Sequence, residues 1–132
     1  MPQAKGPFDV KIVPQPPDAG SQDTTVSRMS LDKQYRGDLE ATGKGQMLAA
    51  GSPNSSGVYV AIEHVTGNLH GRKGSFVIHH TGIMTRLQPQ LTIAVVPDSG
   101  TDELAGISGS LSIEIVDKKH FYSFDYTLPE NF

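Results

Sequence analysis

The chain contains no cysteine. This absence excludes disulfide bonds, zinc sites built from thiolates and a cysteine nucleophile. It also fits a reducing compartment, so we expect a cytoplasmic protein. The first residues, MPQAKGPFDVKIVPQPPDAG, place prolines and charges where a secretory signal needs an uninterrupted apolar stretch. No export signal is expected.

Long apolar runs and basic clusters are also missing. The longest nearly apolar segment, residues 91–96, is far shorter than the roughly 20 residues of a membrane-spanning helix, so we expect a soluble protein with no membrane partner. The net charge is −3, and among the 11 lysines and arginines only Arg72-Lys73 and Lys118-Lys119 are adjacent. Because nucleic-acid binding normally needs a basic patch, we expect no nucleic-acid partner.

Alternation of apolar and polar residues is what the chain has in abundance. Between residues 57 and 128 the period is two, in GVYVAIEHVTG, GSFVIHHTGIM, LTIAVV, GSLSIEIVD and HFYSFDYTL. Valine, isoleucine, tyrosine and phenylalanine favour strands, so the pattern predicts an all-β protein. A strand meander without helices to cover its edges usually closes on itself. We therefore predict a single closed antiparallel barrel of about eight strands.

The 132 residues fit one domain, with its core over roughly residues 8–128. Further strands are expected at residues 8–13, 25–35 and 38–50, with a loop through Ser21 and a turn at residues 51–57. Gly43 and Gly45 would each cost ~1 kcal/mol inside a helix. They suit a strand that bends sharply at a barrel corner.

Residues 57–82 are predicted to form one long hairpin whose register the sequence leaves open. A two-residue turn at Gly71-Arg72 places Glu63 opposite His80. A loop over residues 70–74 instead places His64 opposite His80. The register matters because a slip of one residue moves every side chain of a strand to the other face.

Two strand carboxylates are candidates for chemistry. Charged strand residues usually face solvent, and this orientation is favoured for Glu63. If Glu63 faces the interior instead, it needs a partner or its pKa rises. With His80 opposite, the pair could act as an acid and a base, or the two side chains could only stabilise each other. Glu114 should be exposed if residues 111, 113 and 115 form the core.

The five histidines invite a metal hypothesis. His79 and His80 are adjacent on a strand, so they point to opposite faces, and no His-x-His pair occurs. A site would need one of them to join His64, Glu63 or His120 from another strand. We therefore predict no metal site and no cofactor.

The last strand carries an aromatic face, Tyr122, Phe124 and Tyr126, which we expect to be core rather than a ligand cage. No nucleophile elbow, phosphate-binding glycine loop or paired-carboxylate motif is present, so no catalytic residue is assigned. The candidate ligand-binding residues are Glu63, His80, Tyr59 and Tyr122.

Several segments together resemble a family of small bacterial proteins known only as a domain of unknown function. These are GKGQMLAAG, GVYVAIEHVTGNLHGRKGSFVIHHTGIM, VVPDSGTDELAGISGSLSIEI and HFYSFDYTL, and residues 63–84 are the most specific part. The resemblance covers roughly residues 8–128. The fold of that family resembles the eight-stranded barrel of allene oxide cyclase, which implies the same architecture here. It does not imply cyclase activity, because one barrel hosts unrelated functions.

We expect a non-enzymatic barrel that binds a small apolar or amphipathic molecule in its interior. One alternative is an isomerase or cyclase for a lipid-like substrate, in which Glu63, His80 or Tyr122 supplies polarisation. Another is a structural module that self-associates as a homodimer, because most soluble oligomers are symmetric and exposed strand edges invite pairing.

Overall fold

The computed structural model describes residues 2–16, 25–51, 56–86 and 88–129. Most of the predicted loop through Ser21 and of the predicted turn at residues 51–57 lies outside these residues. The strands are β1 (Gln3–Pro14), β2 (Ser27–Tyr35), β3 (Leu39–Gly51), β4 (Gly57–Leu69), β5 (Arg72–Thr85), β6 (Gln88–Val95), β7 (Ser108–Val116) and β8 (Lys119–Thr127).

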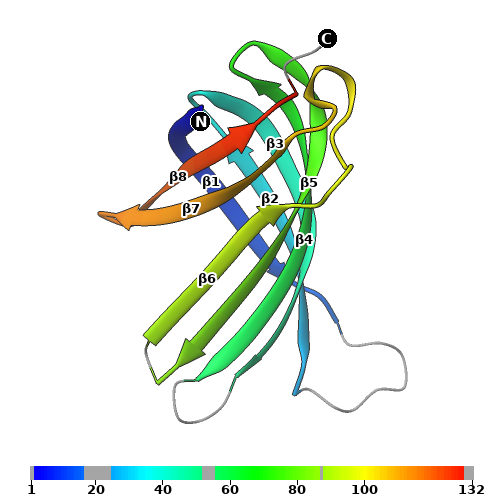
Figure 1. Ribbon diagram of the computed structural model, residues 1–132. Coiled ribbons are helices and arrows are strands. Elements are labelled where there is room, and N and C mark those ends of the chain that lie inside the picture. Colours follow the sequence, from blue (N-terminus) through cyan, green and yellow to red (C-terminus); the bar gives the residue numbers. More distant parts are fainter. Residues whose placement is uncertain (1, 17–24, 52–55, 87, 130–132) are drawn as a thin grey trace.

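Each strand pairs antiparallel with the next, and β8 returns to pair with β1, so the sheet closes into a barrel (Figure 1). The predicted all-β fold and its closed eight-stranded barrel are confirmed. In the described part of the chain, the single helical turn η1 (Asp102–Leu104) is too short to span a membrane, and no other helix is present there.

The β4–β5 hairpin differs from both predicted registers. Its turn is His70-Gly71, with Leu69 opposite Arg72, and Glu63 faces Ile78 rather than His80. Both turn residues have positive φ, 49° and 85°, the twist that suits a two-residue hairpin. Relative to the predicted Gly71-Arg72 turn the pairing is shifted by two residues. Because the shift is even, Glu63 and His80 still share one face of the sheet.

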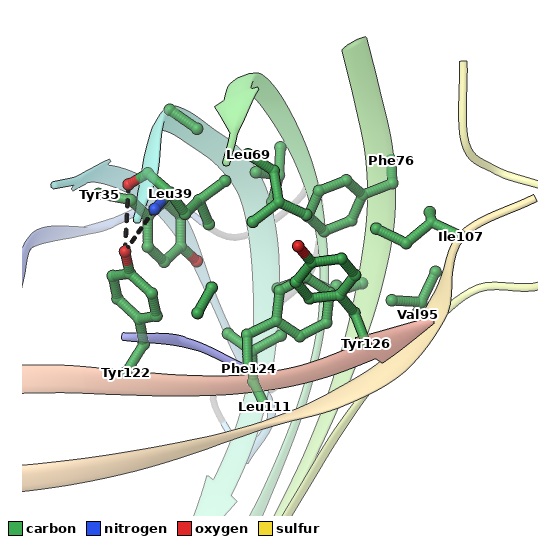
Figure 2. Packing of buried hydrophobic residues seen from close by; sticks show 14 of the residues in the cluster. Tyr35, Leu39, Leu69, Phe76, Val95, Ile107, Leu111, Tyr122, Phe124 and Tyr126 are labelled. Atoms are coloured by element: carbon green, nitrogen blue, oxygen red, sulfur yellow. Dashed lines mark hydrogen bonds between the residues drawn. The ribbon is translucent and has the colours of Figure 1, made fainter. Parts of the chain in front are cut away.

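One end of the barrel is filled by a packed core (Figure 2). The predicted aromatic face of β8 is buried here, and the Phe124 ring lies 5.6 Å from that of Phe76 and 5.3 Å from that of Tyr126. The connection formed by residues 96–107 covers this end. Its backbone bonds to the start of β5, and it buries Leu104 and Ile107 against the core.

No described segment covers the other end of the barrel, which we call the open end. Strands β6 and β7 pair only at Ile93–Leu111 and Ala94–Ser110, and beyond these positions they diverge (Figure 1). Side chains that face inward by alternation are therefore exposed near this end, with Ile12 at 48%, Leu91 at 44% and Ile115 at 63%. Apolar residues line an end of the barrel that the described chain does not cover.

The outer surface of the barrel carries both polar and apolar exposed side chains. Glu114 is exposed, as predicted. Leu48, Val60 and Ile62 also face outward on β3 and β4 and are exposed. Because the barrel closes, strand edges are left without a partner mainly where β6 and β7 diverge. Self-association through exposed edges stays a prediction.

A first prediction concerns the covering connection. Replacing Leu104, which is 1% exposed, by alanine should lower the free energy of unfolding by about 2–5 kcal/mol, as for a residue of a strand core. The outward Leu48→Ala variant is the control and should change it by less than about 0.5 kcal/mol. Urea unfolding measures both. Equal small effects would show that the connection does not close the core.

Candidate functional site

Glu63 faces the barrel interior and is 0% exposed, so the favoured outward orientation is wrong. Its Oε1 lies 2.9 Å from Lys33 Nζ and 3.1 Å from His80 Nε2. Its Oε2 accepts a hydrogen bond of 2.5 Å from the hydroxyl of Tyr35. Glu63 therefore faces inward and has His80 as a partner, which is the alternative that the sequence left open. We call Glu63, Lys33, His80 and Tyr35 the Glu63 cluster.

The bent strand β3 gives the Glu63 carboxylate its space. A Cβ atom at Gly43 would lie 2.0 Å from Glu63 Oε2, and one at Gly45 would lie 2.1 Å from the Ile62 carbonyl oxygen. Neither position tolerates a side chain without movement of its neighbours. The glycines expected at a barrel corner thus also allow a charged group to enter the interior.

Lys33 supplies the positive charge that balances Glu63. It is 5% exposed, and its Nζ lies 5.3 Å from the ring centre of Phe8 and 5.9 Å from that of Tyr35. Aromatic faces attract a cation at such distances. Lys33 and Tyr35 were not among the predicted site residues. Strand alternation could have indicated that they face inward, because both continue the face of β2 that carries Met29 and Leu31.

The cluster keeps Glu63 ionised. Burial by itself raises the pKa of its carboxyl, but the hydrogen bond with His80, the charge of Lys33 and the hydrogen bond from Tyr35 outweigh burial and hold this pKa below its ordinary value of 4.5. Because a carboxylate only accepts hydrogen bonds, Nε2 of His80 carries the hydrogen in this contact. Burial and the charge of Glu63 raise the pKa of Tyr35, which therefore donates.

A cavity of about 470 Å³ lies at the open end of the barrel, between β3, β4, β5 and β6. Its lining includes Met47, Ala49, Tyr59, Gly82, Met84 and Leu91. The ring of Tyr59 lies across Gly82, where an added Cβ would be 2.1 Å from Cε1 of the ring. The same ring lies 6.4 Å from that of His80. Tyr59 therefore separates the cavity from the Glu63 cluster.

Tyr122 lies among the packed residues of the closed end (Figure 2). Its hydroxyl accepts a 2.8 Å hydrogen bond from the Leu39 N–H and donates to the Arg36 carbonyl at 2.7 Å. It contacts the cluster only through its ring, 5.6 Å from that of Tyr35. The structure thus brings together Glu63, His80 and Tyr59 of the predicted set but keeps Tyr122 apart. That Tyr122 binds a ligand stays a prediction.

The remaining histidines do not converge on the cluster. His79 points to the outer face, opposite to His80, as predicted for neighbours on a strand, and His64 is also exposed. Within residues 2–16, 25–51, 56–86 and 88–129, no three His, Asp or Glu side chains come close enough to hold a metal ion.

Comparison with known proteins identifies the family of the chain. The family model described as a protein of unknown function, DUF3224, matches residues 4–126. The chain belongs to the DUF3224 family. It is 44% identical to a DUF3224 protein of unknown function from Shewanella oneidensis MR-1, whose crystal structure matches with a TM-score of 0.90 over 99% of each chain. Among curated proteins, none is similar enough to count as a relative. The likeness to allene oxide cyclase stays a prediction.

The predicted family of unknown function is thereby confirmed, and the family description names no activity. What the site can do chemically therefore has to be inferred from its geometry. Both oxygens of Glu63 are occupied by groups of the protein itself, which makes the cluster a closed polar network. An apolar cavity lies on the other side of Tyr59.

A second prediction tests the buried ion pair. Lys33→Met leaves the Glu63 charge without its cation, and Glu63→Gln leaves the Lys33 charge without its anion, so each should lower the free energy of unfolding by about 3–5 kcal/mol. The double variant should lose less than the sum, because no unpaired charge remains. Denaturant unfolding of all three gives the coupling energy. Additive losses would contradict a direct interaction. Lys44→Met, on the outer face, is the control.

A third prediction concerns pH. The pKa of Glu63 is lower in the folded state than its ordinary value of 4.5, so the unfolded chain takes up this proton first as the pH falls. The stability that Glu63 contributes is complete well above pH 4.5 and is lost as the pH falls through 4.5 towards the folded value. The stability difference between wild type and Glu63→Gln should therefore shrink on acidification. The exposed Glu114→Gln variant should follow wild type. A constant difference for Glu63→Gln would contradict the assignment.

Proposed function

We propose that this DUF3224 protein binds a small apolar or amphipathic molecule in the open end of its barrel. The observation that carries the proposal is the cavity of about 470 Å³ between β3 and β6, whose lining includes the inward-facing apolar side chains Met47, Met84 and Leu91. Its size lies within the range of about 300–1,000 Å³ typical of small-molecule sites.

The energetics of the open end support a ligand. Met84 and Leu91 face inward and line the cavity, yet 38% and 44% of their surface remains exposed. Each Å² of apolar surface removed from water contributes about 25 cal/mol. A hydrocarbon ligand that covers these side chains gains this free energy without changing the packed end of the barrel.

The isomerase or cyclase alternative has less support. It requires a reactive group that can reach a substrate, whereas both oxygens of Glu63 are bonded and the side chain is 0% exposed. Tyr59 is the one candidate residue that lines the cavity. A binding function needs no further group, so we favour it. The self-associating module remains a separate prediction that does not conflict with ligand binding.

A fourth prediction fills the cavity. Ala49→Trp places an indole in the space lined by Met47 and Tyr59, so it should weaken binding of an environment-sensitive apolar dye such as Nile red by about tenfold or more, because little volume is left for the dye. Ala94→Trp, on the outer face of β6, adds the same side chain outside the cavity and is the matched control. Fluorescence titration measures both.

Circular dichroism and thermal unfolding show whether both tryptophan variants keep the barrel. Absence of dye binding to the wild-type protein would contradict the proposed function. Equal weakening by Ala49→Trp and Ala94→Trp would place the dye elsewhere on the surface and would also contradict it.

A further inference from the structure

Among its described lining residues, the cavity at the open end has one hydroxyl, that of Tyr59, and no charged side chain. Apart from Tyr59 itself, none of its described lining residues is ionisable. Gln90 also lines the cavity, but by alternation its side chain belongs to the outer face of β6. The polar group available to a ligand inside is the phenol of Tyr59.

The hydroxyl of Tyr59 differs from those of the other inward-facing tyrosines. Those of Tyr35, Tyr122 and Tyr126 each form a hydrogen bond to the protein. That of Tyr59 has no hydrogen bond to any residue in the described part of the chain. No buried side-chain oxygen of the described residues lacks a partner, so the hydroxyl of Tyr59 is open to solvent and a ligand in the cavity can reach it.

The electrostatics at Tyr59 define which partner fits. The Tyr59 hydroxyl has an ordinary pKa of 10.0, so it is protonated at neutral pH and can donate a hydrogen bond, and burial and the negative charge of Glu63 raise this pKa further. Lys33, the nearest buried cation of the Glu63 cluster, is already paired with Glu63 at 2.9 Å and is only 5% exposed. An anionic headgroup at Tyr59 would meet no free cation and would lie in an apolar surrounding, which disfavours it strongly.

We propose that the ligand of the open end is uncharged and carries a hydrogen-bond acceptor, such as a ketone or ester oxygen, which accepts from the Tyr59 hydroxyl. Its hydrocarbon part then lies against Met47, Met84 and Leu91 and extends towards the open end. This inference rests on the proposed function and specifies its ligand class. It gives Tyr59 the role of orienting the ligand.

The test compares three ligands with similar chains: octane, methyl hexyl ketone and octanoate. Each displaces Nile red from the wild-type protein and from the Tyr59→Phe and Tyr122→Phe variants. Tyr59→Phe should weaken ketone binding about three- to tenfold, the value of one hydrogen bond, and leave octane within about twofold. Tyr122→Phe removes a hydroxyl that bonds only to the protein, so it should leave the ratio of ketone to octane affinity unchanged.

Octanoate should bind more weakly than the ketone at neutral pH, and its affinity should rise as acid converts it to the uncharged form. Octanoate binding as tightly as the ketone at neutral pH would overturn the inference, as would equal effects of Tyr59→Phe on ketone and octane. In both cases ligands still bind, so the proposed function survives. If neither the dye nor any of the three ligands binds, the proposed function itself fails.

Discussion

The ionised carboxylate of Glu63, buried between strands, is the constraint on which this barrel depends. A charge at 0% exposure is tolerable only when other groups compensate it, and here the compensation comes from Lys33 and Tyr35 on β2 and His80 on β5. A slip of one residue in β2, β4 or β5 would turn one partner outward and leave the others unpaired in the interior. The cluster therefore ties three strands to one register. The glycine at position 43 on the intervening strand belongs to the same constraint, because any side chain there would collide with the carboxylate.

The Glu63 cluster also divides the interior into two unlike halves. On one side, aromatic and aliphatic side chains fill the barrel, and the connection of residues 96–107 covers them. On the other side, β6 and β7 share only two residue pairs and then separate, so inward-facing apolar side chains stay exposed. Stability and the proposed ligand binding therefore use different parts of one barrel. The packed half stabilises the fold, and the open half contains the cavity.

Strand alternation made the architecture predictable. The site could not be predicted in the same way, because it depends on the hairpin register and on contacts between distant strands. A period of two and the residue types were enough for an all-β barrel, for the buried aromatic face of β8 and for the opposite orientations of His79 and His80. The hairpin register was not predictable, because it depends on His70 adopting positive φ beside Gly71, a conformation that few non-glycine residues adopt. The inward orientation of Glu63 depends on partners from β2 that lie about thirty positions away in the chain. A lysine on an apolar strand face, as at position 33, was the signal that could have revealed it.

In the proposed ligand-binding role, Glu63 need not touch a ligand to influence which ligand binds. Its carboxylate pairs with Lys33, and the Tyr59 hydroxyl, whose ordinary pKa of 10.0 is raised further by burial and by the charge of Glu63, is protonated at neutral pH. The described inner wall of the cavity therefore presents a donor and no free cation. Selection against anions then follows from the position of the buried ion pair rather than from a repulsive group at the mouth. The Glu63 carboxylate therefore affects both the strand register and the pocket. The carboxylate that fixes the strand register also keeps Lys33 paired and away from the pocket, so a substitution in the cluster should alter folding and the proposed ligand preference together.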